Sequence, residues 1–386
     1  MLGVRLESEE GGQGLEPRQT IPMFKVAMNS DALDKKVLEV LHSGWVGQGA
    51  RVANFEAALA NKLRNPRVLC LSAGTHGLTL ALRLAGVGPG DEVITTPLTC
   101  TATNMPILQQ GADIVWADVG QDFNISPLSV ESSLTDRTRA IIVVHWGGYP
   151  CEMNEIAKIA HDAGGIPVIE DCAHAYGSTY RNWVIGECEH SAFAIFSFQA
   201  IKHLTTVDGG ALCCRLDDDY DRGKLLRWYG IDRETPRQDM RCEEDIREWG
   251  YKFHMNDVCA IIGLCNMEDA DLNISKAISN ARYYEDNLLK VDGISLTQLG
   301  SGRQSSYWLF TVLVEERPSF VRMMTTRGIA VSRVHQRNDK HACFGQYRRD
   351  LPGLESIIDR MVCIPVGWWV SEEDREYIVG CIKEGW

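Results

Sequence analysis

Between residues 196 and 210 the chain reads Phe196-Ser197-Phe198-Gln199-Ala200-Ile201-Lys202-His203-Leu204-Thr205-Thr206-Val207-Asp208-Gly209-Gly210. One lysine, Lys202, stands there between an aromatic, apolar run and a turn rich in threonine and glycine. Upstream, the apolar run Ile166-Pro167-Val168-Ile169 predicts a strand that delivers Glu170-Asp171 at its C-terminal end. The chain thus offers an amine and a carboxylate, each next to a predicted strand.

Such a pair suits pyridoxal phosphate. Lysine forms a Schiff base with the aldehyde of this cofactor, and a carboxylate that pairs with the pyridinium nitrogen lets the ring act as an electron sink. Taken alone, a lysine after a core strand is more often an ordinary surface residue. The neighbouring motifs favour the catalytic interpretation of Lys202, with Asp171 as its partner.

Length, composition and charge exclude several classes of protein. A chain of 386 residues is long enough for a large core and for two lobes. No run of about 18 apolar residues predicts a membrane span, and residues 1–20 lack a signal-peptide pattern and are expected to form a frayed, flexible tail. The formal net charge of −13 argues against nucleic acid or an anionic membrane as the main partner, although a local basic pocket can still bind a phosphorylated ligand.

The 13 cysteines indicate a reducing compartment. They are scattered from Cys70 to Cys381 and include no Cys-x-x-Cys pair. Cysteine then serves as a small apolar residue, neither in disulfides nor as a zinc ligand. We therefore expect a cytoplasmic enzyme without a metal.

Hydrophobic periodicity predicts an α/β fold. Strands are expected at 67–71, 93–95, 114–116 and 141–144, and helices at 30–42, 51–63, 76–85 and 153–163. Such alternation predicts a mainly parallel sheet between helices, with ligands bound beyond the carboxyl ends of its strands, where Asp171 lies. Beyond residue 265 we expect a helix at 274–290, strands at 307–314 and 329–334, a helix from Ser319 and a capped final helix after Ser371. The expected organisation is a tail at 1–20, a large domain at 21–265 and a smaller α+β domain at 266–386.

Two segments suggest a phosphate site. Ser72-Ala73-Gly74-Thr75 lies between a predicted strand and helix, where free backbone N–H groups bind anions and glycine permits close approach. An ordinary helix cap at Thr75 is the alternative. Ser197 is placed to reach the same phosphate, or else forms a turn. The glycine cluster at 86–90 follows a helix and precedes a strand, the reverse of a dinucleotide-binding motif, so we interpret it as a turn.

Taken together, these motifs resemble those of a known family, the sugar aminotransferases of the DegT type, which are fold-type-I pyridoxal phosphate enzymes. The resemblance rests on an ordered set of motifs that spans nearly the whole chain from about Ile21. The motifs are Ser72–Thr75, Asp91–Thr95, Glu170–Gly177, the Lys202 segment, Gly250–Asp257 and Ser306–Trp308.

The resemblance implies a role for each matching residue. Lys202 would be the Schiff-base lysine and Asp171 the partner of the pyridine nitrogen. Gly74, Thr75 and Ser197 would hold the phosphate. Taken alone, a histidine such as His174 is more often structural. The resemblance places it at a position where relatives often have Gln or His near the phenolic oxygen of the cofactor. The resemblance also implies a homodimer with shared active sites, in which Lys252, often Asn in relatives, reaches the phosphate of the neighbouring subunit.

The chain departs from the family pattern in two places. Cys100 stands where relatives usually have an aromatic residue that stacks on the cofactor ring. The segment at 334–341 lacks the usual Tyr/Pro-rich character and, with the residue before it, is locally cationic. These basic residues would suit the binding of a nucleotide diphosphate. The alternative is that the segment is an ordinary solvent-exposed loop. The residues are Arg333, His335, Arg337, Lys340 and His341.

The resulting functional hypothesis is an aminotransferase. It would convert a nucleotide-linked keto-hexose, most simply a 4-keto-6-deoxy sugar, to the amino sugar, with L-glutamate as donor and pyridoxamine phosphate as the intermediate cofactor form. One alternative is a pyridoxamine-dependent sugar dehydratase on the same fold. The resemblance implies that those enzymes carry histidine at the position of Lys202, so Lys202 argues against this alternative. A second alternative is a non-catalytic regulator that binds the cofactor. A third is a nicotinamide dehydrogenase, but the sequence has no correctly placed glycine-rich turn to bind its cofactor.

Overall fold

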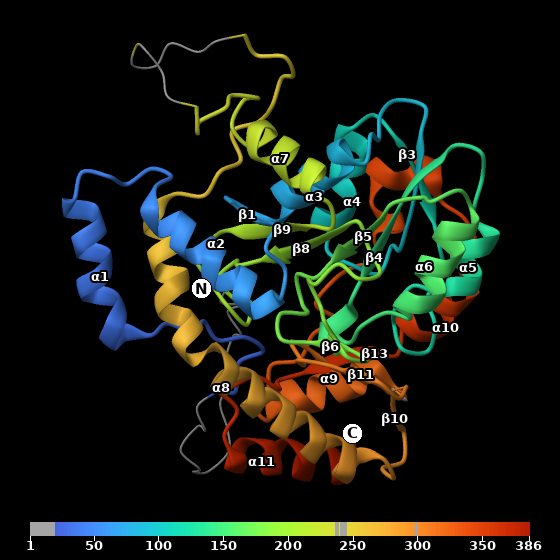
Figure 1. Ribbon diagram of the computed structural model, residues 1–386. Coiled ribbons are helices and arrows are strands. Elements are labelled where there is room, and N and C mark those ends of the chain that lie inside the picture. The colour runs from blue at the N-terminus through green and yellow to red at the C-terminus, as the bar shows by residue number, and fades with distance from the viewer. Residues whose placement is uncertain (1–19, 236–238, 240–244, 298–299) are drawn as a thin grey trace.

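A seven-stranded sheet forms the centre of the large lobe (Figure 1). The computed structural model describes residues 20–235, 239, 245–297 and 300–386. The strand order is β1-β9-β8-β5-β4-β2-β3. The strands are β1 (Val68–Leu71), β2 (Glu92–Thr95), β3 (Asp113–Trp116), β4 (Thr138–Val144), β5 (Val168–Asp171), β8 (Phe193–Ser197) and β9 (Gly210–Cys214). Only β9 runs antiparallel to its neighbours β8 and β1, so the prediction of a mainly parallel sheet is confirmed.

Both faces of this sheet are covered, which explains why its strands appear as nearly continuous apolar runs. Ile142, Ile169 and Leu212 belong to one hydrophobic core, whereas their strand neighbours Ile141 and Val168 belong to the core on the opposite face. The covering helices are α2 (Ala50–Leu63), α3 (Gly74–Leu84), α4 (Thr101–Gln109), α5 (Pro127–Ser132), α6 (Met153–Asp162) and α7 (Asp217–Leu226).

The small lobe has its own sheet and core. The sheet consists of the antiparallel strands β10 (Ile294–Leu296), β12 (Phe310–Val314) and β13 (Met361–Ile364). It is covered by α9 (Arg317–Thr326), α11 (Glu372–Lys383) and the end of α8 (Asp257–Leu288). The expected capping box opens α11, where Ser371 and Asp374 bond each other's backbone N–H.

Short elements complete the chain. A third sheet joins β6 (Thr179–Tyr180), β7 (Trp183–Val184) and β11 (Arg303–Gln304). The remaining helices are α1 (Ser30–His42), α10 (Pro352–Ile358) and the 3₁₀ turns η1 (Trp146–Gly148), η2 (Asn338–Lys340) and η3 (Ala342–Tyr347). No helix in the described parts of the chain is long and apolar enough to span a membrane.

The structure differs from the sequence prediction in two elements. Helix α8 begins at Asp257, not near 274, because Asn256 caps it by accepting a hydrogen bond from Cys259 N–H. It therefore crosses the expected boundary between residues 265 and 266, with its first half against α1 and α2 and its last turns in the small core (Figure 1). The strand expected at 329–334 is reduced to single bridges at Ile329 and Ser332, and Val334 at its end adopts a left-handed conformation with φ of 67°. The tail expected at 1–20 lies, except for residue 20, outside the described residues.

Candidate active site

The residues expected to act together converge at the carboxyl edge of the large sheet. Asp171 is the last residue of β5, Ser197 is the last of β8, and α3 begins at Gly74 directly after β1. Lys202 follows β8 in a tight turn, where its N–H donates to Gln199 O at 2.9 Å. Parallel strands end at one edge of a sheet, so the alternation of strands and helices brings these segments together.

Asp171 is a buried carboxylate with a defined hydrogen-bond environment. One oxygen accepts from the Thr103 hydroxyl at 2.7 Å, and the other accepts from Ala173 N–H at 3.0 Å. Burial raises the pKa of Asp171, and these two hydrogen bonds oppose the rise. Each oxygen keeps acceptor capacity for a further donor such as a protonated ring nitrogen. Thr103 was missed from the sequence, because nothing in its local pattern distinguishes it.

The Lys202 amine is poised to exchange a proton. Burial lowers the pKa of Lys202 to about 8, while the charge of Asp171 opposes that fall. An amine with such a pKa is available in both protonation states near neutral pH, as a general acid and base must be.

The structure fixes the tautomer of His174. Its Nδ1 atom lies 3.3 Å from the N–H of Gly147 and accepts that hydrogen bond. Burial, followed by the charge of Lys202, holds the pKa of His174 well below its usual range. The imidazole is therefore neutral with its proton on Nε2, which makes it a hydrogen-bond donor to an oxygen anion.

The start of α3 forms a backbone cradle. The helix cap is Ala73, so Thr75 is not the cap, and no side chain bonds the first N–H groups. A β-carbon on Gly210 would lie 2.5 Å from Gly74 N, and one on Gly74 would lie 3.0 Å from Ser197 Cβ. These two glycines let β8, β9 and the helix N-terminus meet closely, an arrangement that binds phosphate.

The chemistry of these groups fits pyridoxal phosphate. A nucleophilic amine, a buried carboxylate, a neutral imidazole donor and a helix N-terminus match the aldehyde, ring nitrogen, phenolic oxygen and phosphate of that cofactor. Cys100, half-buried before α4, contributes no aromatic face. An aromatic ring does lie close to the amine, because the ring centroid of Trp308 is 3.6 Å from Lys202 Nζ.

The predicted substrate loop reaches this site through His335. Its ring lies parallel to His174 with centroids 5.8 Å apart, and edge-on to Trp146 at 5.9 Å. Burial, with a contribution from the charge of Lys202, lowers the pKa of His335 to about 4. The loop is fixed by Asn338, whose side chain donates to Thr99 O at 2.7 Å.

The other basic residues of the loop are not brought together as one cationic cluster. Arg337 is buried and bonds both carboxylate oxygens of Asp339 at 2.7 Å. Arg333 faces Asp359 at 3.6 Å. Lys340 is exposed, and His341 is half-buried.

Lys252 lies on an exposed part of an extended segment. Its side chain is exposed, and its backbone forms an isolated antiparallel bridge with Trp228. The following residue, Phe253, accepts a hydrogen bond from Ser72 N–H at 2.7 Å, which ties this segment to the start of α3.

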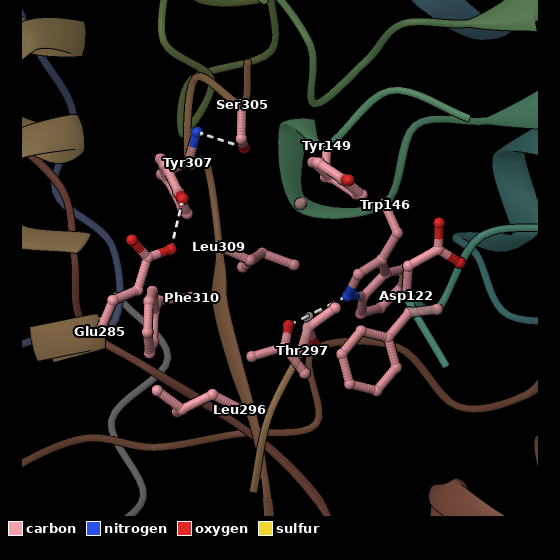
Figure 2. A pocket seen from close by; sticks show the side chains of 13 residues that line it. Asp122, Trp146, Tyr149, Glu285, Leu296, Thr297, Ser305, Tyr307, Leu309 and Phe310 are labelled. Atoms are coloured by element: carbon pink, nitrogen blue, oxygen red, sulfur yellow. Dashed lines mark hydrogen bonds between the residues drawn. The ribbon is translucent and has the colours of Figure 1, made fainter. Parts of the chain in front are cut away.

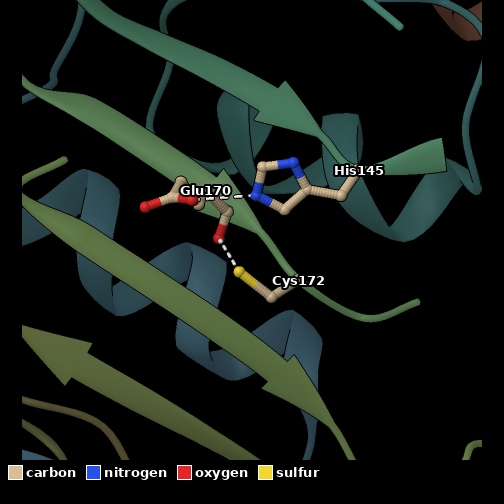
Figure 3. Close-up of side chains that lie close together, drawn as sticks. All are labelled: His145, Glu170 and Cys172. Atoms are coloured by element: carbon tan, nitrogen blue, oxygen red, sulfur yellow. Dashed lines mark hydrogen bonds and ion pairs between the residues drawn. The ribbon is translucent and has the colours of Figure 1, made fainter. Parts of the chain in front are cut away.

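A buried trio beside Asp171 has the composition of a metal site but not its free ligand atoms (Figure 3). His145 Nε2 pairs with Glu170 at 2.8 Å, and His145 Nδ1 accepts from Cys151 N–H at 3.1 Å. The second oxygen of Glu170 accepts from Ser191, and Cys172 Sγ donates to the backbone carbonyl of Glu170. This is a self-contained polar network that anchors the ends of β4 and β5.

Comparison with known proteins shows which family this chain resembles over most of its length. Residues 28–383 match the sequence model of the DegT/DnrJ/EryC1/StrS aminotransferase family. The crystal structure of AtS13 from Actinomadura melliaura is 46% identical, with a TM-score of 0.92, and the match covers 96% of this chain and all of that one. The sugar aminotransferase CalS13 from Micromonospora echinospora is 42% identical, with a TM-score of 0.91 and coverage of 95% and 100%.

A relative of named activity is the UDP-4-amino-4-deoxy-L-arabinose–oxoglutarate aminotransferase of Shewanella sediminis. It is 29% identical over 385 residues, which represent 94% of this chain and 97% of the relative. The putative sugar aminotransferase Spr1654 from Streptococcus pneumoniae has been solved in a PLP form and a PMP form, which are 26% and 25% identical to this chain with TM-scores of 0.86.

Proposed function

Because this chain belongs to the DegT/DnrJ/EryC1/StrS aminotransferase family of pyridoxal-phosphate-dependent sugar aminotransferases, we propose that it aminates a nucleotide-linked keto-hexose. The proposed substrate is a 4-keto-6-deoxy sugar and the proposed amino donor is L-glutamate. The observation that carries this proposal is the placement of Lys202, Asp171 and His174 around one edge of the sheet. The oxoglutarate named for the Shewanella relative supports glutamate as donor, since oxoglutarate is the keto acid that glutamate leaves behind.

Each side chain has one task in this proposal. When bound, pyridoxal phosphate supplies the electron sink that stabilises negative charge at the carbon next to the reacting nitrogen. Lys202 Nζ would hold the aldehyde carbon of the cofactor. Once the amino group of the donor replaces it there, the freed amine would carry a proton between that carbon and the carbon of the amino acid or sugar. Asp171 would hold the positive charge on the ring nitrogen, His174 would donate from Nε2 to the phenolic oxygen, and the α3 N-terminus and Ser197 would bind the phosphate.

The two half-reactions test this function separately. Glutamate added to the protein loaded with pyridoxal phosphate should shift its absorbance maximum and release oxoglutarate. The aminated protein should then be offered a panel of nucleotide keto-sugars that differ in base, in sugar and in the position of the ketone. If glutamate shifts the absorbance maximum but no keto-sugar restores it, the proposed sugar substrate is wrong. If glutamate causes no shift at all, the result favours a regulator.

We further propose that the loop at 333–341 binds the nucleotide diphosphate, with Lys340 as an outward-facing cation. Lys340→Ala should raise the Michaelis constant for the sugar about ten-fold, because one charge-assisted contact contributes about 1.5 kcal/mol or more. The glutamate half-reaction should stay unchanged, which stopped-flow absorbance measures.

Arg337 offers the contrasting variant in the same loop. Arg337→Ala leaves Asp339 buried without its partner, a change that costs about 3 kcal/mol or more. We expect a lower melting temperature and losses in both half-reactions. If Lys340→Ala behaves in the same way as Arg337→Ala, the loop is structural and the nucleotide binds elsewhere.

We propose a homodimer whose sites are shared, with Lys252 reaching the cofactor phosphate of the partner. The exposure of the Lys252 side chain supports this, because an exposed side chain can contact a neighbouring subunit. Lys202→Ala and Lys252→Ala should each be inactive, yet subunit exchange between them should restore activity. In a random mixture half of the dimers are hybrids with one intact site, so about a quarter of wild-type activity should return. A mixture that stays inactive would mean that each site is built within one chain.

A further inference from the structure

We propose that the indole of Trp308 is the position to which the amine of Lys202 retreats whenever it is not bound to the cofactor. Trp308 is then a positioning residue that stabilises the ammonium form of the catalytic lysine. This inference rests on the proposed role of Lys202 and adds a residue whose contribution the motifs do not reveal.

The geometry places the amine on the aromatic ring. Lys202 Nζ lies 3.6 Å from the Trp308 ring centroid, well within the distance at which a cation is attracted by a π face. The indole Nε1 donates to the carbonyl of Ile201 at 2.9 Å, so the ring is bonded to the residue that precedes the lysine. Phe24 and His174 stack on the same indole, with centroids 5.0 Å and 3.9 Å away. The indole is therefore held in place before the lysine arrives.

The neighbours of Trp308 keep it turned toward the lysine. Tyr307 and Leu309 line a cavity of about 50 Å³, together with Trp146 and Tyr149 of the large lobe and Glu285 of α8 (Figure 2). Tyr307 is anchored there by its hydroxyl, which donates to Glu285 at 2.6 Å. The N–H of Leu309 donates to Gly147 O at 3.2 Å. With the residues on both sides held in this way, the intervening Trp308 is presented to the active site.

Few other groups compensate the charge of the amine. Asp171 on β5 and Cys100 before α4 favour the charged lysine, whereas burial opposes it more strongly. Three imidazoles around it have lowered pKa values, to which the charge of Lys202 contributes, and are neutral near pH 7; they belong to His174, His203 and His335. A π face attracts a cation without adding a formal charge.

This placement matters for proton transfer. In each half-reaction Nζ takes one proton from a substrate or cofactor carbon and returns one proton to the other carbon, so the lysine ends as it began. Between these events the amine carries the extra proton while detached from the cofactor. The indole holds the ammonium within reach of the reacting carbons and away from bulk water.

The test uses the protein loaded with pyridoxamine phosphate, in which Lys202 is a free amine. The pKa of its [ε-¹³C]-labelled side chain is measured by NMR, with the signal assigned by its loss in Lys202→Arg. Trp308→Leu should lower this pKa by about 1.5 units, which is the loss of a desolvated cation–π contact of about 2 kcal/mol converted at about 1.36 kcal/mol per pKa unit. Trp308→Phe keeps a π face and should stay close to the wild-type value. Phe24→Leu, which removes a ring that supports the indole but not the π face itself, should change it little.

The outcomes separate this inference from the function on which it rests. A Leu variant with the wild-type pKa would overturn the role of Trp308, and so would a Phe variant that falls as far as Leu. If Lys202 titrates identically in the pyridoxal and pyridoxamine forms, the lysine does not bind the cofactor and the function itself fails. Loading the protein directly with pyridoxamine phosphate makes the measurement independent of glutamate and of the sugar.

Discussion

Lys202→Ala should abolish turnover while the chain keeps its fold. The variant loses the group that binds the aldehyde and moves the proton, and a general base alone contributes about 10²–10⁴-fold. Cofactor should still bind noncovalently, because Asp171, His174 and the start of α3 remain in place. Activity assays and cofactor absorbance measure the two effects.

Chemical labelling identifies the lysine independently. Borohydride reduction of the loaded protein followed by peptide mapping should attach the label to Lys202. Lys158→Ala is a suitable control, because Lys158 pairs with Asp162 on the surface of α6 and should leave activity unchanged. A label on any other lysine, or turnover by Lys202→Ala, would refute the assignment.

Asp171→Asn should fold normally and lose nearly all turnover. An amide does not stabilise a protonated ring nitrogen, so the loss should appear in kcat and amount to about 10²–10³-fold or more. The fold should tolerate the change, because Thr99 and Thr103 form a hydroxyl pair at 2.7 Å in which either oxygen can donate. That pair can reverse and accept the new amide N–H.

A milder variant should reduce turnover by a smaller amount. Thr103→Val removes the hydroxyl that opposes the raised pKa of Asp171, so it should lower turnover less than Asp171→Asn does. Steady-state kinetics with saturating cofactor distinguishes weak binding from slow chemistry. Near-native kcat in Asp171→Asn would contradict the role given to the carboxylate.

Much of this site was predictable because its determinants are local. Strand–helix alternation predicts a parallel sheet, and a parallel sheet collects its strand ends at one edge. Residues that directly follow strands, such as Asp171 and Gly74, therefore converge without any knowledge of side-chain packing. Fold class and the meeting of these segments follow from periodicity alone.

The remainder depends on tertiary contacts that no local pattern encodes. Arg337 looked free as one of several cations, but its partner Asp339 is two residues away and becomes buried with it. The first half of α8 packs against α1 and α2 as well as the large core, so its apolar residues form no single stripe. The orientation of Trp308 depends on the hydrogen bond from its indole N–H to the carbonyl of Ile201, which is 107 residues away in the sequence.

The length of α8 limits how the two lobes can be recombined with those of relatives. Its 32 residues form a rod of about 48 Å that belongs to both lobes at once. A chimaera that imports a foreign small lobe must be joined inside this rod, where each inserted or deleted residue turns everything beyond it by about 100°. Functional chimaeras should therefore tolerate many sequence differences at the junction, but only those that preserve the helical phase of α8.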